Sequence, residues 1–414
     1  MAVFLLILGI VLFVGLVVVH EFGHFIVARR NGVEAEEFGI GFPPRAWSRK
    51  LGSGLLFSIN WLPIGGFVKL KGEHDSDTAP GTFGAASLMV KAKIMLAGVG
   101  MNLLAAFVLL TVLAWAGMPQ LVGNQFTVKR DSHTANQRVF VGQVESGSPA
   151  SHAGLRDHDQ IIGAWTGRVV GCNYLVRGAS NPPDCSLQVR QEHPDTTFLT
   201  AQDLTHFTKS HAGQPVTFMV SRGGRRLVTP TVTLLTAQTV AASQKANTPK
   251  GYLGVAPEEF SLTRSTWSAP IVAAGLIKQF TVLTVQGLGH ALGGLGSTLA
   301  GLATGNKSAR QAGQAEATGE VSGPVGIVVV LHDTSLLGYQ YVLLVIAIIS
   351  LTLAIMNVLP IPALDGGRLF LLLIARLLKK PLTQENEERI VGAGFAVLML
   401  LVVLITIVDV KRFF

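Results

Sequence analysis

The sequence is poor in charged residues and in cysteine. Only 14% of its 414 residues are charged, whereas a soluble protein usually has roughly a quarter. Because 49% of the residues are hydrophobic, the composition excludes an ordinary soluble enzyme and predicts an integral membrane protein with some aqueous mass. The two cysteines, Cys172 and Cys185, are too few for a four-thiolate zinc site and lack C-x-x-C spacing. If the two cysteines lie outside the cytoplasm, they can form a disulfide; otherwise they remain free thiols, and the sequence leaves both alternatives open.

A net charge of +8 does not indicate a nucleic-acid-binding protein here. The basic residues are not gathered into a patch interleaved with aromatic side chains. They lie beside the apolar runs, as is typical of cytoplasmic loops next to lipid. We therefore expect membrane lipid as a neighbour and no nucleic acid.

Four apolar stretches are long enough to cross a bilayer, which needs about 20 residues of helix. They are Ala2–Ala28, Ile94–Met118, Leu336–Val358 and Ile390–Val408. The first lacks a basic n-region and a small-residue cleavage site, so we interpret it as a retained anchor and not a signal peptide. A fifth candidate, Ala269–Ala303, contains many glycines and some polar residues. We interpret it as a helix pair on the membrane surface, because a crossing there would reverse every later element.

The distribution of Lys and Arg predicts the orientation. The loop after the first span contains Arg29, Arg30, Arg45, Arg49, Lys50, Lys69, Lys71, Lys91 and Lys93. The loop after the third span contains Arg368, Arg376, Lys379, Lys380 and Arg389. Both loops are therefore predicted to be cytoplasmic, with both termini and residues 119–335 outside. Lys411 and Arg412 near the C-terminus are a contrary signal.

An H-E-x-x-H motif, His20-Glu21-Phe22-Gly23-His24, follows nineteen residues without a charge. On a helix, positions i and i+4 are about 40° apart, so both imidazoles face one way and can share a zinc ion. Glu21 is then placed to act on a water at the metal. The motif alone is weak, but its position at the end of a membrane-length run is rare. It predicts cleavage of a peptide bond within a membrane.

A candidate third ligand follows the third span, in Asn357-Val358-Leu359-Pro360-Ile361-Pro362-Ala363-Leu364-Asp365-Gly366-Gly367. Its two prolines end the helix, which leaves Asp365 in irregular backbone at the cytoplasmic side. Asp365 could simply cap the next helix, but its predicted depth matches that of His20 and His24. Two imidazoles and one carboxylate would leave zinc a fourth position for water.

Two amides accompany these residues. Asn102 lies in the second span after Gly98-Val99-Gly100-Met101, where the glycines allow close helix approach. Its role is either an interhelical hydrogen bond or support of the site. Asn357 lies one helical face from the proline turn and has the same two interpretations.

Together the three motifs resemble the site-2 protease family, and in particular the bacterial RseP-type intramembrane zinc metalloproteases. The resemblance extends to residues 38–42 and 62–70, 251–255 and 322–327, and so covers nearly the whole chain. It implies that His20, His24 and Asp365 bind Zn²⁺ and that Glu21 is the catalytic base. It also implies that Asn102, Asn357, Gly65 and Gly66 support the site or the substrate. Residues 38–42 and 62–70 would form a membrane re-entrant β-structure that helps to hold the substrate as an extended strand.

The segment after the second span has soluble-type signals. Thr200 is a candidate helix cap, and Gly223-Gly224 joins two strand-like runs, Pro215–Arg222 and Arg225–Leu235. Residues 144–162 resemble a bacterial PDZ domain, with residues 165–199 inserted. Such a domain could bind a peptide strand or only limit access by size, and both roles remain open.

The sequence thus predicts an α-helical polytopic membrane protein with four transmembrane helices, re-entrant β-structure and an inserted extracytoplasmic α+β PDZ domain. The predicted domains are 1–118, 119–250, 251–335 with amphipathic surface helices, and 336–414. The implied function is cleavage of single-span membrane proteins, such as anti-sigma factors or remnant signal peptides, in regulated intramembrane proteolysis at the bacterial inner (cell) membrane. The alternatives are a catalytically inactive membrane PDZ scaffold and a zinc transporter. The transporter would need several in-membrane ligands along a path, whereas one cluster is found.

Overall fold

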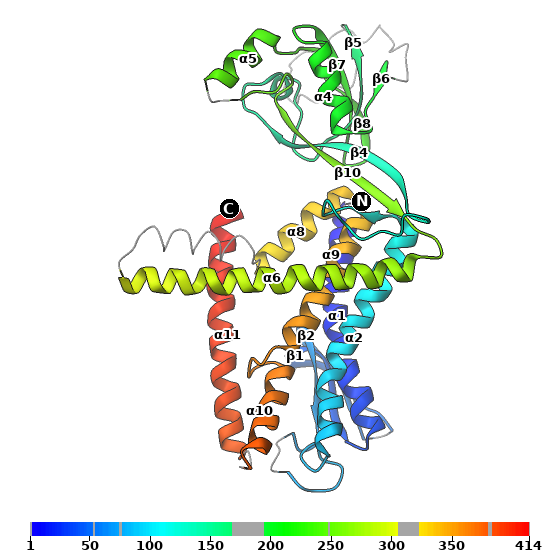
Figure 1. Cartoon of the computed structure of the whole chain (residues 1–414). Coiled ribbons are helices and arrows are strands. Elements are labelled where there is room, and N and C mark those ends of the chain that lie inside the picture. Colours follow the sequence, from blue (N-terminus) through cyan, green and yellow to red (C-terminus); the bar gives the residue numbers. More distant parts are fainter. Residues whose placement is uncertain are drawn as a thin grey trace. The chain divides into compact units, whose positions relative to one another are not determined.

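The computed structural model describes residues 2–52, 54–73, 77–167, 194–246, 249–304, 323–379 and 383–413 (Figure 1). The chain divides into two compact units. The helical unit consists of Val3–Trp115, Gln125–Val128 and Thr266–Phe414. The mixed unit consists chiefly of Ala116–Asn124 and Lys129–Ser265. Each unit is described by itself.

In the described part of the helical unit, five helices are long and apolar enough to cross a membrane. They are α1 (Ala2–Arg30), α2 (Leu88–Ala116), α6 (Ala269–Thr304), α9 (Tyr339–Val358) and α11 (Gln384–Phe413). The shorter helices α8 (Pro324–Leu337) and α10 (Asp365–Leu377) lie on either side of α9 in the sequence. In α1, α2 and α9 apolar residues cover every side, a pattern typical of helices surrounded by protein or lipid.

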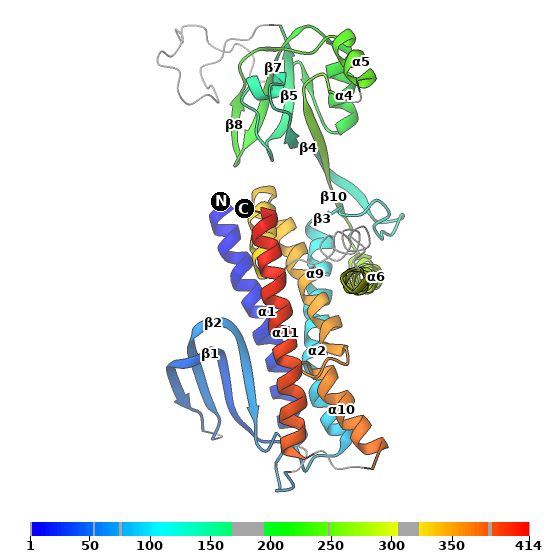
Figure 2. The same cartoon turned by 90° about the vertical axis from the view of Figure 1, so that its left-hand side faces the viewer.

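α6 is the segment that the sequence left ambiguous. It forms one continuous helix, so the predicted helix pair is wrong. Its glycines each cost about 1 kcal/mol relative to alanine, which is too little to break a long apolar helix. The helix runs crosswise to α1, α2, α9 and α11 (Figures 1 and 2). Its composition would permit a crossing, but its direction differs from that of the other four.

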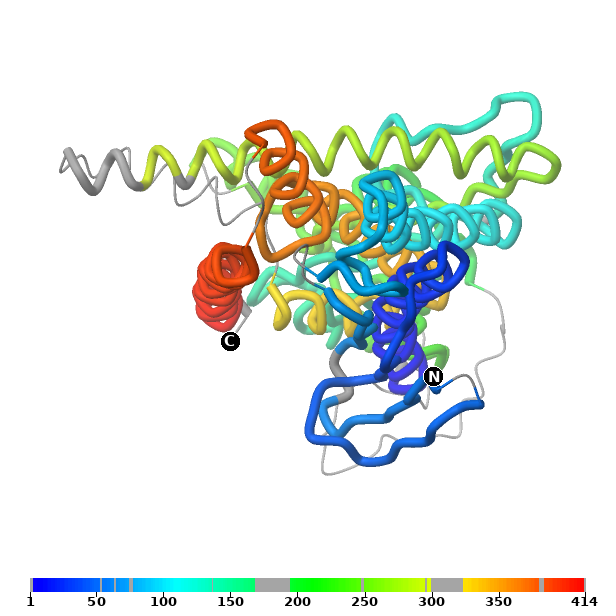
Figure 3. The backbone as a smooth tube through the Cα atoms, turned by 90° about the horizontal axis from the view of Figure 1, so that it is seen from below, coloured from blue at the N-terminus to red at the C-terminus, as the bar shows by residue number. Residues whose placement is uncertain are grey.

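A β-sheet of β1 (Ala35–Lys50) and β2 (Leu56–Leu70) lies beside α1 (Figures 2 and 3). The strands fold back on themselves, so Phe38 lies opposite Val68 on one side and Phe57 on the other. The rings of Phe22 and Phe25 on α1 contact the ring of Phe38, with centroid distances of 6.4 and 5.6 Å. This aromatic cluster attaches the sheet to the helix that carries the H-E-x-x-H motif.

The mixed unit contains an eight-stranded sheet with strand order β3-β10-β4-β5-β7-β8, in which β6 pairs with β5 and β9 with β7. The strands are β3 (Met118–Pro119), β4 (His133–Val144), β5 (Gln160–Thr166), β6 (Thr196–Thr197), β7 (Pro215–Arg222), β8 (Arg225–Val228), β9 (Val232–Thr233) and β10 (Val255–Arg264). Its helices are α3 (Pro149–His152), α4 (Ala201–Ser210) and α5 (Ala237–Lys245). Ile161, Leu204 and Phe218 lie in one buried core, where α4 packs against the sheet.

Two local predictions for this unit are confirmed. Thr200 caps α4, and the Asp203 carboxylate completes a capping box by accepting the Thr200 backbone N–H at 2.9 Å. β7 and β8 form the predicted hairpin, and Gly223 and Gly224 both have positive φ, as a type I′ turn requires. The second predicted strand, Arg225–Leu235, is divided into β8 and β9.

The predicted boundary at residue 250 is wrong, because β10 belongs to the mixed unit and pairs with β4. β10 begins with Val255-Ala256-Pro257-Glu258-Glu259. The sequence does not indicate a strand here, because a proline and two carboxylates interrupt the alternation of apolar and polar residues. Proline is tolerated where a strand lies near a sheet edge. Most of the predicted insertion, residues 168–193 with Cys172 and Cys185, lies outside the described residues.

Candidate active site

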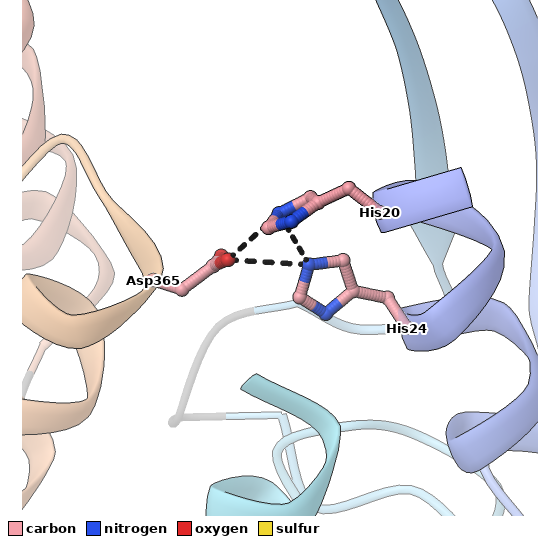
Figure 4. A group of neighbouring side chains, drawn as sticks. All are labelled: His20, His24 and Asp365. Atoms are coloured by element: carbon pink, nitrogen blue, oxygen red, sulfur yellow. Dashed lines mark hydrogen bonds and ion pairs between the residues drawn. The ribbon is translucent and has the colours of Figure 1, made fainter. Parts of the chain in front are cut away.

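Three side chains from distant parts of the sequence converge in the helical unit. His20 and His24 project from the last turns of α1, and Asp365 from the first turn of α10 (Figure 4). The Asp365 Oδ2 atom lies 3.1 Å from His20 Nε2 and 3.2 Å from His24 Nε2. The two Nε2 atoms are 3.1 Å apart. The three atoms therefore form a nearly equilateral triangle.

The other ring nitrogens determine which form of each imidazole is present. His24 Nδ1 lies 2.7 Å from the Ile94 carbonyl oxygen, so Nδ1 donates, and Nε2 of the neutral imidazole carries a lone pair. His20 Nδ1 lies 3.2 Å from the Asn102 amide, whose Oδ1 is buried and has no hydrogen-bond partner. Amide oxygen and nitrogen are assigned from their partners. Turning the Asn102 amide over lets Oδ1 accept from His20 Nδ1–H and also leaves His20 Nε2 with a lone pair.

This donor set fits a zinc ion. Tetrahedral zinc with bonds of about 2.0–2.2 Å to N and O ligands separates those ligands by about 3.3–3.6 Å, close to the separations observed. Two imidazole lone pairs and a carboxylate oxygen repel one another at such distances unless a cation lies among them. The Ile94 carbonyl and the Asn102 amide make the outer contacts that usually orient metal-binding imidazoles.

Glu21 lies beside these three residues. With His24 and Asp365, it lines a cavity of about 140 Å³ that Val68 of β2 also borders. A Cβ atom on Gly66 of β2 would lie 3.6 Å from Glu21 Cγ. The carboxylate is thus placed between the histidine pair and the sheet, where it can exchange protons with a group held at the triangle.

Glycines on α1 and α2 allow the two helices to approach closely. A Cβ on Gly23 would lie 2.6 Å from the Ala97 carbonyl oxygen, so α1 packs directly on the α2 backbone. Gly98 faces the imidazoles in the same way. The expectation that the second span approaches closely through its glycines holds for Gly98, whereas Gly100 has nothing within 4 Å.

The turn before α10 holds Asp365 in place. A side chain on Gly366 would collide with the Val358 carbonyl, and one on Gly367 with the Ile361 carbonyl. Both glycines therefore let the start of α10 fold tightly against the end of α9. This close packing positions the carboxylate three residues beyond Pro362, at the level of the histidines.

The remaining predicted residues differ in their placement. Gly65 has φ +97° and packs under the Phe42 ring, while Gly66 borders Glu21. Asn357 donates to the Leu353 carbonyl of its own helix at 3.0 Å. That bond stabilises the last turn of α9, the helix that ends just before the turn carrying Asp365. Asn357 therefore affects the site only through the backbone, whereas Asn102 contacts His20 directly.

One buried carboxylate was missed. A charged run such as the one at the start of β1 is typical of a solvated edge, but Glu37 is buried and accepts from Ser58 at 2.7 Å and from Arg45 at 2.6 Å. Neighbouring strand residues face opposite sides, so Glu36 pairs with Lys69 at the surface while Glu37 points inward. That alternation was the available signal.

Comparison with known proteins agrees with this geometry. The model of peptidase family M50 matches residues 8–401. A candidate zinc metalloprotease of Clostridium acetobutylicum is 29% identical, with 99% of this chain and 98% of that protein covered. The zinc metalloprotease RasP of Geobacillus kaustophilus is 26% identical, with 98% and 97% covered. The chain therefore belongs to peptidase family M50, the site-2 protease family of zinc metalloproteases.

Proposed function

We propose that this protein is an intramembrane zinc endopeptidase in which His20, His24 and Asp365 hold the metal and Glu21 is the catalytic base. The observation that carries the proposal is the triangle of three lone-pair donors beside the Glu21 carboxylate, near the end of an apolar helix. Family membership supports the zinc and the protease chemistry.

Bound zinc would supply a Lewis acid that polarises the scissile carbonyl and makes water more acidic. Glu21 takes a proton from the attacking water as its oxygen bonds to the carbonyl carbon. Glu21 then gives the proton to the nitrogen as the C–N bond breaks. Asn102 and the Ile94 carbonyl keep both imidazoles in the orientation that directs Nε2 inward.

The substrate in this proposal is a single-span membrane protein, of the anti-sigma factor or remnant signal peptide type. A helical span must unwind before its peptide bonds become accessible. Gly66 and Val68 of β2 border the space in front of Glu21, so an extended segment laid along β2 would bring its peptide bonds to that carboxylate. New backbone hydrogen bonds would offset part of the cost of unwinding.

We place α1, α2, α9 and α11 across the bacterial inner (cell) membrane, with both termini extracytoplasmic and the site near the cytoplasmic side. Arg29 and Arg30 at the end of α1 support this orientation. The crosswise direction of α6 supports a position at the membrane surface. The mixed unit would then be an extracytoplasmic PDZ domain. Within it, α4 is attached to β10 by a hydrogen bond from Ala201 N–H to Glu259 at 3.3 Å.

The substitution Glu21→Gln tests the catalytic assignment. It keeps the size of the side chain but removes the base, so zinc content should stay near one per chain while cleavage of a co-expressed single-span protein is lost. Glu36→Gln, at a surface carboxylate paired with Lys69, is the matched control and should cleave normally. Continued cleavage by Glu21→Gln, or wild-type protein without zinc, would contradict the proposal. A dead scaffold predicts no cleavage by the wild type either.

A further inference from the structure

The last helix, α11, has an unusual distribution of burial. Although most of α11 is apolar, its only buried residues in the described range 384–412 are two carboxylates, one toward each end. Glu387 is 6% exposed and Asp409 is 2% exposed. An ionisable residue buried in a membrane helix is costly unless it has partners, so these two residues mark where α11 is attached.

At one end Asp409 caps another helix. Its Oδ2 atom accepts the backbone N–H groups of Gly323 at 2.9 Å and Gly326 at 2.8 Å, at the start of α8. Gly323 itself supplies no side-chain cap. A negative charge at a helix N-terminus is stabilised by the unpaired N–H groups and the helix dipole. Asp409 therefore fixes this end of α11 to α8.

At the other end Glu387 meets the helix that begins with Asp365. Its Oε1 atom lies 3.4 Å from an NH2 nitrogen of Arg368, three residues after Asp365 on α10. The same nitrogen donates to the Glu73 carbonyl at 3.3 Å. Arg368 also lines the cavity that contains Glu21. The contact thus ties α11 to the wall of the catalytic cavity.

Between these ends α11 touches the turn that carries Asp365. A Cβ atom added to Gly394 would lie 3.0 Å from Pro362 Cβ and 3.2 Å from the Ala363 backbone nitrogen. Even a methyl group at this position would press on the turn, and a larger side chain would have to displace it. Gly392, on another face of the same helix, has open space around it.

We infer that α11 holds Asp365 against the two histidines, and that Gly394 and Glu387 are positioning residues for the metal site. This inference rests on the proposed function. The helix is attached near its two ends by Asp409 and Glu387, and between them Gly394 packs against the turn that precedes Asp365. Displacing that turn would move Asp365 away from the His20 and His24 nitrogens without changing any ligand.

Gly394→Leu tests the inference, with Gly392→Leu as the matched control. Both variants are purified in detergent, and zinc affinity is measured by chelator competition, together with the thermal midpoint of the zinc-free protein and substrate cleavage. Gly394→Leu should bind zinc about 10–100-fold more weakly, the range for residues that orient metal ligands, while its zinc-free midpoint stays unchanged. Gly392→Leu should match the wild type. Equal affinity in Gly394→Leu, or equal losses in both variants, would overturn the inference.

A second pair covers the case in which Gly394→Leu fails to fold. Glu387→Gln removes the charge that meets Arg368, and Glu385→Gln removes an exposed charge that pairs with Arg389. Only Glu387→Gln should weaken zinc binding, and unchanged affinity there would count against the inference. Wild-type zinc binding and cleavage test the proposed function, whereas the ratio between variant and wild type tests the role of α11.

Discussion

Gly98 of α2 lies so close to His24 of α1 that a methyl group on Gly98 would be 2.5 Å from the His24 Nε2 atom. The same methyl group would lie 2.6 Å from His20 Nε2. Absence of a side chain at residue 98 is therefore a condition for both nitrogens to face a common ligand. α2 therefore contributes to the candidate metal site in two ways: Gly98 leaves space for the imidazoles, and Asn102 contacts His20.

Gly98→Ala should accordingly lower zinc affinity. Contacts below 3 Å force the imidazoles or the helices apart, so we expect a loss of at least about tenfold, as for other changes that disturb ligand orientation. Chelator competition measures it. Gly100→Ala, two residues away with nothing within 4 Å, is the control and should bind zinc normally. Normal affinity in Gly98→Ala would show that the helices can shift freely.

Substitutions of Asn102 distinguish an accepting amide from a donating one. If Asn102 Oδ1 accepts from His20 Nδ1–H, then Asn102→Asp keeps an acceptor and should keep most of the zinc affinity. Asn102→Ala should lose about 10–100-fold. A measured affinity that is lower for Asp than for Ala would instead mean that the amide donates to His20.

The exposed tip of the β1–β2 sheet predicts contact with lipid. Trp61 is 71% exposed there, and its neighbour Leu62 is 52% exposed. Large apolar side chains left uncovered in this way indicate an apolar environment. Brominated lipids in reconstituted vesicles should quench part of the tryptophan fluorescence, and Trp61→Phe should lower that part, leaving the share of other exposed tryptophans such as Trp47 and Trp115. Trp165, buried in the mixed unit at 2% exposure, should contribute no quenched signal.

The capping box of α4 predicts a pH-dependent stability of the mixed unit. The backbone N–H of Thr200 bonds to the Asp203 carboxylate and lowers its pKa below the usual value. The folded-state pKa lies below the unfolded one, so this stabilisation is complete above the unfolded pKa and is lost as pH falls through the folded pKa. Hydrogen exchange of the α4 amides, corrected for intrinsic rates, should show protection falling in acid. Asp203→Ala should remove that pH dependence.

Removing the Thr200 side chain, the other half of the capping box, should destabilise α4 at every pH. Thr200→Ala deletes the side-chain oxygen that accepts the Asp203 N–H at 3.1 Å, which typically costs about 1 kcal/mol. The α4 amides of this variant should therefore exchange faster at neutral pH as well. Unchanged protection would mean that packing of Leu204 and Phe207, not the cap, sets the stability of the helix.

The sequence predicts residues whose role depends on local spacing. H-E-x-x-H places two imidazoles on one helix face, and the prolines before Asp365 end a helix at a definite depth. It does not reveal contacts between distant elements. Gly394 and Gly98 look like ordinary glycines in apolar helices until their neighbours are known, and Asp409 looks like a polar helix end. β10 was missed because Pro257 and two glutamates obscure its alternation. Glu37 looks like its exposed neighbours in a charged run until its partners Arg45 and Ser58 are known.

The bond from His24 to the Ile94 carbonyl restricts how this protein can move. Because a main-chain oxygen of α2 orients an imidazole of α1, sliding these two helices past each other would disrupt the candidate metal site. The turn that carries Asp365 is packed just as tightly, through Gly366 and Gly367. Any motion that admits a substrate would therefore have to leave both contacts in place.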